Sequence, residues 1–528
     1  MNNSPFSFSR VLYTAVIFLL GMSVAFYFVK NQRNTPNTYD KLRDLIYYID
    51  HYYVDSVCHE QFSEDALCGM LARLDPHSTY ANAEAKEEQT EQLEGAFEGI
   101  GVQFNIMNDT IMVVAALAGG PSEKAGIKAG DRIVLVNDEP VANIGISNEQ
   151  VRKILKGKKG THVKVGIIRP DVDGVLDFDI VRNVIPTHSI TSAYMMNNQI
   201  GYIKIDQFGG HTADEFTDAL YKLISKGMQK FILDLRGNSG GYLEAALKIT
   251  DHFLQKDDLM LSVKGLHTKQ EEFFASGKGA FKQGEVIVLI DEFSASASEI
   301  VAGAIQDNDR GVIIGQRSFG KGLVQRPFNF SDGSQVRLTV SRYYTPSGRC
   351  IQRDYNNGTA AYYEELLQRI INEEDTLSNS SDSLSAVEYR TKAGRIVYGG
   401  GGITPDVTVP HEKRIHSNDY YQALNSAALI QFAFNYANQN KAMLTKNSPS
   451  AESFIKKMQI NEMVLKDYLK FYAQKNSVEF PTLNTEEKNL LCSWLKAFIG
   501  RNLYQDEAFY PIINTMDEVI LEALKHCN

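Results

Sequence analysis

Between residues 190 and 410, the apolar residues follow two patterns that alternate along the chain. Short continuous apolar runs bounded by polar turns are typical of buried strands, and an apolar residue at every third or fourth position is typical of a helix. The runs are Ile200–Ile205, Phe231–Leu235 and Val286–Ile290, and the stretches with helical spacing are Ala213–Lys226 and Leu243–Leu254. Strands that alternate with helices predict an α/β core.

Different patterns hold outside this core. Residues 39–93 and 411–528 have helical spacing, whereas residues 95–185 contain alternating strands, such as Val102–Ile106, between glycine-rich turns. A chain of 528 residues is also too long for one hydrophobic core. The sequence therefore predicts a multidomain α/β (mixed α+β) protein: an N-terminal helical region, a small β domain, the core over residues 190–410 and a helical C-terminal extension.

Two features interrupt the alternation inside the core. Asp332-Gly333, which precedes the strictly alternating residues Gln335–Val340, is a signal for a hairpin turn. Asn356–Ser385 is rich in Glu, Asp, Asn and Ser and predicts a mobile insertion, after which the core resumes at Gly401.

The N-terminal residues 1–30 contain an apolar stretch, Val11–Val29, with no charge, preceded by Arg10 and followed by Lys30. Its length is close to what a helix needs to cross a bilayer, so it predicts a single-pass membrane anchor. The alternative is a cleaved signal peptide, because Ser23-Val24-Ala25 is a small-x-small site. With either alternative, the rest of the chain acts outside the cytoplasm.

Composition and charge exclude several classes of function. The net charge of −10 gives no basic surface for nucleic acid. The five cysteines form no C-x-x-C pair and the eleven histidines no H-x-x-x-H pattern, so we expect neither a bound metal nor a cofactor. The sequence leaves the disulfide state open.

The strongest candidate for chemistry is the serine-rich turn Ser294–Glu299, which lies between a predicted buried strand and a helical pattern. A hydroxyl at such a turn, with Lys321 supplied by a later segment, provides the groups of a Ser–Lys hydrolase. The alternative is structural, because Ser296-x-x-Glu299 also fits a helix capping box. Gly315–Lys321 resembles the front of a phosphate-binding P-loop, but Gly322 stands where that loop needs Ser or Thr.

A third segment, Arg236–Gly241, follows the predicted strand Phe231–Leu235. Its glycines fit a tight turn, and they would also allow backbone N–H groups to converge on a developing oxyanion. A glycine loop, a serine turn and a glycine-flanked lysine, each at a strand end, together indicate a catalytic site.

The order of strands and turns over residues 95–185 resembles a PDZ domain, above all in Ala125–Asn137. The resemblance places Gly99, Ile100, Gly101 and Val102 at the loop that binds the carboxylate of a peptide C-terminus. A glycine-rich turn in an unrelated small β domain is the alternative.

Seven motifs in order over residues 39–410 resemble the C-terminal processing peptidases, or tail-specific proteases, of the S41 type. They are Leu74–Ser78, Phe97–Val102, Asp234–Gly241, Ser294–Glu299, Phe319–Gln325, Tyr343–Arg349 and Gly402–Asp406. The resemblance implies that Ser296 is the nucleophile, Lys321 the general base and Gln325 the residue that positions the lysine. It also implies that the N–H groups of Gly241 and Ala297 are the oxyanion donors.

We therefore expect a serine endopeptidase that selects protein substrates by their C-terminal tails. The apolar stretch predicts that it is anchored in the cell membrane through residues 11–29, with its catalytic region outside the cytoplasm, on the periplasmic side in a Gram-negative cell. A non-catalytic PDZ-type scaffold of the cell envelope is the alternative function. The helical residues 411–528 carry no recognisable chemistry, and the sequence leaves the substrate, the oligomeric state and any activating partner open.

Overall fold

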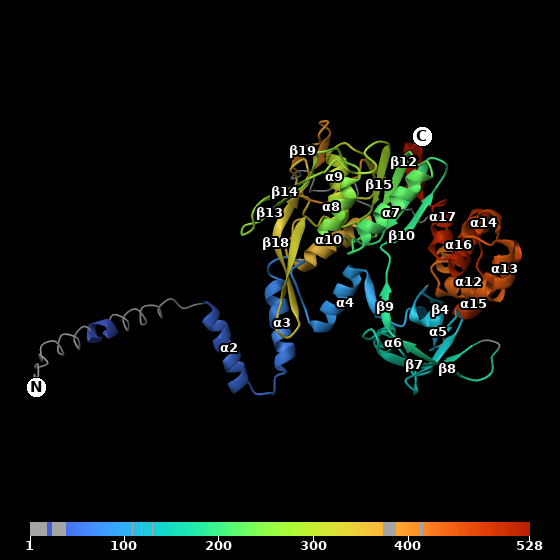
Figure 1. The fold of residues 1–528 in the computed structure, drawn as a ribbon, viewed down its shortest axis with the longest axis horizontal. Helices are drawn as coiled ribbons and strands as arrows, with labels where there is room; N and C mark the ends of the chain where they lie inside the picture. Colours follow the sequence, from blue (N-terminus) through green and yellow to red (C-terminus); the bar gives the residue numbers. More distant parts are fainter. Residues whose placement is uncertain are drawn as a thin grey trace, which may run out of the picture. The chain divides into compact units, whose positions relative to one another are not determined.

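The structure is a computed structural model that describes residues 18–23, 38–107, 109–117, 119–128, 130–169, 172–372, 387–410 and 416–527 (Figure 1). The chain divides into two units, residues 1–70 and 71–528. The first unit contains helix α2 (Thr38–Tyr52) and nearly all of α3 (His59–Leu71). The predicted anchor Val11–Val29 lies mostly outside the described residues. Among the helices described, none has the length and apolar character needed to span a membrane.

A six-stranded sheet forms the centre of the second unit, and its strands coincide with the apolar runs in the sequence. The order is β10-β11-β12-β15-β16-β21, in which only the edge strand β10 is antiparallel to its neighbour. The strands are β10 (Ile190–Met195), β11 (Ile200–Ile205), β12 (Lys230–Asp234), β15 (Glu285–Ile290), β16 (Val312–Gly315) and β21 (Val407–Thr408). The predicted α/β core is confirmed.

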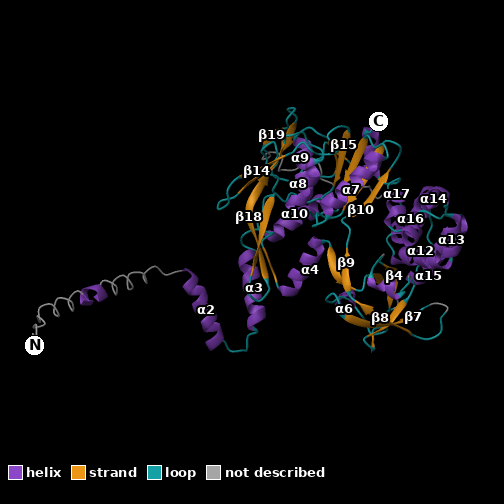
Figure 2. Ribbon diagram, in the orientation of Figure 1, coloured by secondary structure: helices purple, strands orange, loops and turns teal. Residues whose placement is uncertain are grey.

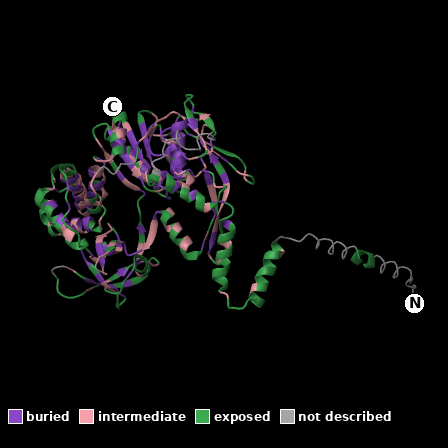
Figure 3. Cartoon of the chain, turned by 180° about the vertical axis from the view of Figure 1, so that it is seen from behind, coloured by how far each residue is buried: buried purple, intermediate pink, exposed green. Residues whose placement is uncertain are grey.

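Helices cover both faces of this sheet because successive strand residues point to opposite sides. Residues such as Ile203, Leu233 and Val288 belong to one buried cluster with α7 (Thr212–Ser225), α8 (Leu243–Asp251) and α9 (Ala297–Asp307). Their neighbours Tyr202, Ile232 and Ile287 pack with the C-terminal helix α18 (Glu518–His526). All residues of α9 are buried, and Figure 3 shows this helix in the buried colour. The start of α9 is therefore held rigidly.

A second, smaller sheet brings the N-terminal and late segments of this unit together. Its order is β1-β18-β13-β14, with β17 paired to β18. Figure 2 labels β14 and β18 of this sheet. The strands are β1 (Thr79–Ala81), β13 (Leu259–Lys264), β14 (Glu271–Phe274), β17 (Leu323–Asn329) and β18 (Gln335–Tyr344). Strands β17 and β18 form an antiparallel pair on either side of Asp332-Gly333, so the predicted hairpin is confirmed.

The small β domain has its own core and its own sheet, in the order β3-β4-β5-β7-β8 with β6 paired to β5. Its elements are β3 (Val102–Ile106), β4 (Ile111–Ala116), α5 (Pro121–Ala125), β5 (Arg132–Val136), β6 (Glu139–Pro140), α6 (Asn148–Leu155), β7 (His162–Ile168) and β8 (Leu176–Val181). Strand β2 (Ala96–Gly99) pairs with β9 (Asn183–Pro186) where the chain enters and leaves this domain.

Helices complete the rest of the chain, and one of them corrects a prediction. Residues Thr359–Asn372 of the predicted mobile insertion form helix α10, whose Tyr362 and Leu366 are buried. Tyr362 and Leu366 have helical spacing, but the polar composition of Asn356–Ser385 hides this pattern in the sequence. Residues 373–386 lie outside the described residues. The remaining elements are α4 (Ala83–Glu94), β19 (Glu388–Arg390), β20 (Ile396–Tyr398), α11 (Asn418–Leu424), α12 (Ala427–Gln439), α13 (Lys441–Asn447), α14 (Ala451–Lys457), α15 (Glu462–Asn476), α16 (Thr485–Tyr504) and α17 (Asp506–Ile513).

Candidate active site

Ser296 lies in the turn that joins β15 to α9, with φ of 54° and ψ of −110°. A non-glycine residue in such a conformation carries strain on the order of 1–3 kcal/mol, and strained residues of this kind cluster at functional sites. Hydrogen bonds to the loop after β12 hold the turn: the Ala295 N–H and the Ser298 hydroxyl both donate to the Asn238 carbonyl, at 3.0 and 2.9 Å. These contacts on both sides of Ser296 maintain its conformation.

The glycine loop Arg236–Gly241 lies directly against this turn. Gly240 has φ of 105°, and a Cβ there would lie 2.8 Å from the Cβ of Ser296. Gly241 has φ of 143°, and a Cβ on it would lie 2.1 Å from the Phe208 carbonyl oxygen. Any side chain at these two positions would clash, so the glycines allow the loop backbone to approach the serine.

Glu299 joins the serine turn to the segment that carries the lysine. Its Oε2 accepts the N–H groups of Ser296 and Lys321, both at 2.8 Å, and its Oε1 accepts the Gly320 N–H at 2.7 Å and the Ser318 hydroxyl at 2.6 Å. Burial raises the pKa of Glu299, and the four hydrogen bonds oppose this rise. The bond from Ser296 is half of the capping box that the sequence suggested, so the same glutamate caps α9 and positions both segments.

Lys321 is half-buried at the end of this segment, just before β17. Burial away from water lowers the pKa of its ammonium group, and the nearby positive charge of Arg337 acts in the same direction, whereas Glu299 opposes them. The Lys321 Nζ donates a hydrogen bond to Gln325 Oε1 at 3.0 Å. The Tyr343 hydroxyl donates to the carbonyl oxygens of both Lys321 and Ser296, at 2.6 and 3.1 Å. The lysine is thus held in a fixed position and biased toward its neutral form.

Gln325 is anchored in turn by the motif Leu74–Ser78, to which the sequence gave no role. Gln325 Nε2 donates to the His77 carbonyl oxygen. Asp75 accepts the N–H groups of His77 and Ser78, both at 2.8 Å, and so holds this turn closed. Burial and the positive charge of Lys321 lower the pKa of His77 to about 4, so the imidazole is neutral at neutral pH. The motif was visible in the sequence, but its contact with Gln325 spans about 250 positions and was not.

A cavity of about 660 Å³ contains the groups from all these segments. Its lining includes Gly241, Ser296, Ala297, Lys321, Gln325, Arg337 and Tyr343. Within the described part of the chain, neither the Gly241 N–H nor the Ala297 N–H has a hydrogen-bond acceptor. Among the described residues, no hydrogen bond joins the Ser296 hydroxyl to Lys321. A hydroxyl, a base and two free backbone donors in one cavity are suited to acyl transfer.

The predicted carboxylate-binding loop connects β2 to β3 in the small β domain. Gly99 ends β2, Ile100 is buried, and Gly101 has φ of 73°. The Ile100 carbonyl oxygen accepts hydrogen bonds from the N–H and the hydroxyl of Ser122, at 3.0 and 2.7 Å. A cavity of about 440 Å³ adjoins residues 99–102. This loop lies in a domain with its own core and is not part of the cavity around Ser296.

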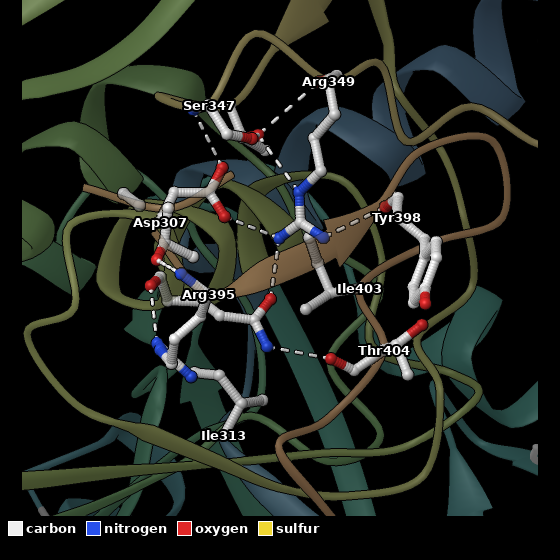
Figure 4. Close-up of polar contacts among 12 residues, drawn as sticks. Asp307, Ile313, Ser347, Arg349, Arg395, Tyr398, Ile403 and Thr404 are labelled. Carbon is white, nitrogen blue, oxygen red and sulfur yellow. Dashed lines mark hydrogen bonds and ion pairs between the residues drawn. The ribbon is translucent and has the colours of Figure 1, made fainter. Parts of the chain in front are cut away.

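A buried ion pair fixes the opposite end of α9 (Figure 4). The Arg349 guanidinium donates to Asp307 Oδ1 and Gln306 Oε1, both at 2.7 Å, and to the Tyr398 carbonyl at 3.0 Å. Gln306 Nε2 donates to the Thr404 carbonyl at 2.9 Å. The exposed fraction is 0% for Arg349 and 1% for Asp307. The motifs Tyr343–Arg349 and Gly402–Asp406 therefore have a structural role, because they hold the helix whose first turn carries Ser296.

Comparison with known proteins assigns a class to this fold and site. Residues 199–361 match peptidase family S41, and residues 112–169 match the PDZ domain family. Residues 420–505 match a family of unknown function. The chain is 35% identical over 352 residues to a carboxy-terminal-processing protease of Bartonella bacilliformis, covering 66% of this chain and 79% of that protein. The chain therefore belongs to the S41 peptidases and is a serine-type peptidase with a PDZ domain.

A second sequence relative agrees with this class, and a solved structure is also similar. Carboxy-terminal processing protease CtpB of Bacillus subtilis is 34% identical over 353 residues, which cover 64% of this chain and 72% of that protein. A solved structure described as photosystem II D1 C-terminal processing protease is 27% identical and covers 60% of this chain and 84% of its own, with a TM-score of 0.36. The sequence relatives place this chain within the C-terminal processing proteases.

Proposed function

We propose that this peptidase cleaves proteins selected by their C-terminal tails and that it uses a Ser296–Lys321 dyad. The observation that carries the proposal is the half-buried Lys321, whose amine Gln325 holds in the cavity that contains Ser296 and whose pKa is lowered by desolvation. A lysine acts as a general base only when it is neutral, and burial favours that form.

In the proposed mechanism, Ser296 Oγ attacks the scissile carbonyl carbon while Lys321 Nζ takes the hydroxyl proton. The N–H groups of Gly241 and Ala297 stabilise the oxyanion, since both line the cavity and have no other acceptor among the described residues. Lys321 then returns the proton to the leaving amine. Water, activated by the same lysine, hydrolyses the acyl-enzyme.

The environment of His77 supports a mechanism without histidine. His77 lies near Lys321, but its pKa of about 4 makes it a weak base, and its Nε2 pairs with the Tyr362 hydroxyl at 3.1 Å. Lys321 hydrogen-bonds to Gln325 and not to Ser296; hydrogen bonds of catalytic groups often tighten only when substrate binds.

The PDZ domain supports selection by the C-terminus. We assign the carboxylate of the substrate tail to the loop Gly99–Val102, where the positive φ of Gly101 turns the backbone. The proposed location is the cell membrane, with residues 11–29 as a single-pass anchor and the catalytic region outside the cytoplasm, on the periplasmic side in a Gram-negative cell. A cleaved signal peptide would give the same side of the membrane.

The test is covalent labelling and cleavage with the full chain. A serine-reactive acylating probe should modify Ser296, as mapped by peptide mass spectrometry, and a substrate with a free apolar tail should be cleaved faster than its amidated form. The Ser296→Ala protein should do neither. Labelling of wild-type protein at another residue would contradict the dyad, and the absence of labelling and cleavage would favour the scaffold alternative.

A further inference from the structure

A second cavity of the core has no role in the proposed chemistry. It has a volume of about 840 Å³ and shares no lining residue with the cavity around Ser296. Its charged lining residues are Arg317, Arg342, Arg353, Asp354 and Glu365. We call it the arginine cavity. Its volume lies in the range of cavities that bind small molecules.

Arg353 is the most constrained of the arginines. Its side chain is 5% exposed, and its guanidinium carbon lies 4.0 Å from the ring centre of Tyr362 and 4.6 Å from that of Phe319. Stacking of this kind uses the face of the guanidinium and leaves its N–H edge for hydrogen bonds. Among the described residues, Nε and Nη2 of Arg353 have no acceptor. The two rings thus hold a buried cation in which Nη1 donates to the Tyr362 carbonyl oxygen and to Glu365, whereas Nε and Nη2 are not satisfied.

Arg317 presents a second guanidinium to the same cavity. Its side chain is 11% exposed and packs against Gly401, where a Cβ would lie 3.3 Å from Arg317 Nη1. Its Nε has no acceptor in the described residues, and its Nη2 lies 3.6 Å from Glu365 Oε1, beyond hydrogen-bond distance.

The carboxylates of the cavity do not satisfy these donors. Glu365, which is 41% exposed, contacts Arg353 as well as Arg317, so one carboxylate serves two guanidinium groups. Asp354 accepts the Asn356 N–H of its own turn at 3.1 Å. Buried donors without acceptors are destabilising, and a planar oxyanion is the partner that a guanidinium edge fits best.

We propose that the arginine cavity binds a small organic anion through a carboxylate or phosphate group held by Arg317 and Arg353. The anion partly displaces Glu365, and the two guanidinium groups turn their buried, unsatisfied N–H groups toward it. The net positive lining in a chain of net charge −10 gives the cavity a local attraction for anions.

Binding at this cavity is coupled to the lysine segment. The Arg353 N–H donates to the Gly320 carbonyl at 3.0 Å, and the Gly322 N–H donates to Gln352 Oε1 at 2.9 Å. Residues 352 and 353 thus bond to the glycines on both sides of Lys321. An anion bound by Arg353 adds a further restraint on this segment; this part of the inference rests on the proposed function, in which Lys321 is the base.

The test of binding uses the inactive Ser296→Ala chain, so that its result does not depend on catalysis. Thermal unfolding is followed while inorganic phosphate or succinate replaces chloride at constant ionic strength. Saturable stabilisation by one of them supports the proposal and identifies the group. Absence of saturation with both overturns it.

Two variants with opposite expected effects separate a binding site from a structural ion pair. Arg317→Gln should weaken the anion affinity by about tenfold or more, the effect of one charge-assisted hydrogen bond. Glu365→Gln should strengthen it, because the competing carboxylate is gone. Arg326→Gln is the matched control: Arg326 is exposed and lies 5.7 Å from the Phe328 ring, outside the cavity. Equal effects of Arg317→Gln and Arg326→Gln, or weaker binding by Glu365→Gln, overturn the proposal.

The coupling is tested separately with the active chain. The anion that binds should raise kcat for a tailed substrate at unchanged KM, and Arg317→Gln should remove this increase. Saturable binding without any change in kcat would overturn the coupling and leave the binding site intact.

Discussion

Replacing Glu299 with glutamine tests whether one buried carboxylate organises the active site. A carboxylate accepts all four donors around it, whereas an amide offers one oxygen and an NH₂ group that cannot accept. Either orientation of the amide leaves two of the four donors, on Ser296, Ser318, Gly320 and Lys321, without an acceptor. Each lost charge-assisted bond costs about 1.5–3 kcal/mol, so the two together cost about 3–6 kcal/mol.

Part of this cost is returned, because the burial that raises the pKa of Glu299 also penalises its charge. We expect a net loss of about 2–4 kcal/mol in the free energy of unfolding. We also expect slower acylation of Ser296, because its turn is no longer tied to the Lys321 segment. Urea unfolding and probe labelling measure the two effects, with Glu271→Gln on the exposed strand β14 as the control. Wild-type stability and labelling in Glu299→Gln would refute this reasoning.

Further predictions concern other parts of the chain. Arginine at Lys321 should abolish cleavage, since a guanidinium stays protonated; near-normal turnover would argue against the dyad. The pKa of His77 is lowered from 6.5 to about 4, so between these pH values the unfolded state binds a proton that the folded state does not. The free energy of unfolding should therefore fall as the pH is lowered from 6.5 to about 4, by about 3 kcal/mol in all. His77→Gln should flatten that pH dependence in urea titrations, and an unchanged slope would contradict it. Tryptophan at Gly101, where a Cβ would lie 2.9 Å from Ile185 Cδ1 at φ of 73°, should reduce cleavage of a tailed substrate while probe acylation survives; equal loss of both would contradict separate roles. An uncleaved anchor predicts a membrane-bound protein that salt does not extract, whereas a mature N-terminus at Phe26 would show a signal peptide.

The sequence predicted the core where local pattern and tertiary burial agree. Ile200–Ile205 and Val286–Ile290 are strands at or within one residue of the predicted bounds, because continuous apolar runs suit a sheet that is covered on both faces. Helix α10 was missed because the polar composition of Asn356–Ser385 outweighed the spacing of Tyr362 and Leu366, which are buried. The position of α18 on the central sheet also required the structure, since no local pattern specifies the partner of an apolar helix face.

The candidate site shows the same division. Motifs identified Ser296 and Lys321, and the structure brings both to one cavity. The contacts of Glu299 with Gly320 and of Gln325 with His77 join distant segments, so no local spacing reveals them. From the sequence, Glu299 was assigned only to a helix cap. In the structure its carboxylate accepts four hydrogen bonds, of which the cap bond from the Ser296 N–H is one.

The most direct test of the dyad is the pH dependence of acylation at Ser296 in wild type and in Lys321→Met, which keeps an apolar side chain of similar length. The account predicts that the wild-type rate rises with pH through one ionisation below the ordinary lysine pKa of about 10.4. In Lys321→Met this ionisation should disappear and the rate should fall by about 10²–10⁴, while the protein stays folded. An unchanged pH profile and rate in Lys321→Met would contradict the assignment of Lys321 as the base.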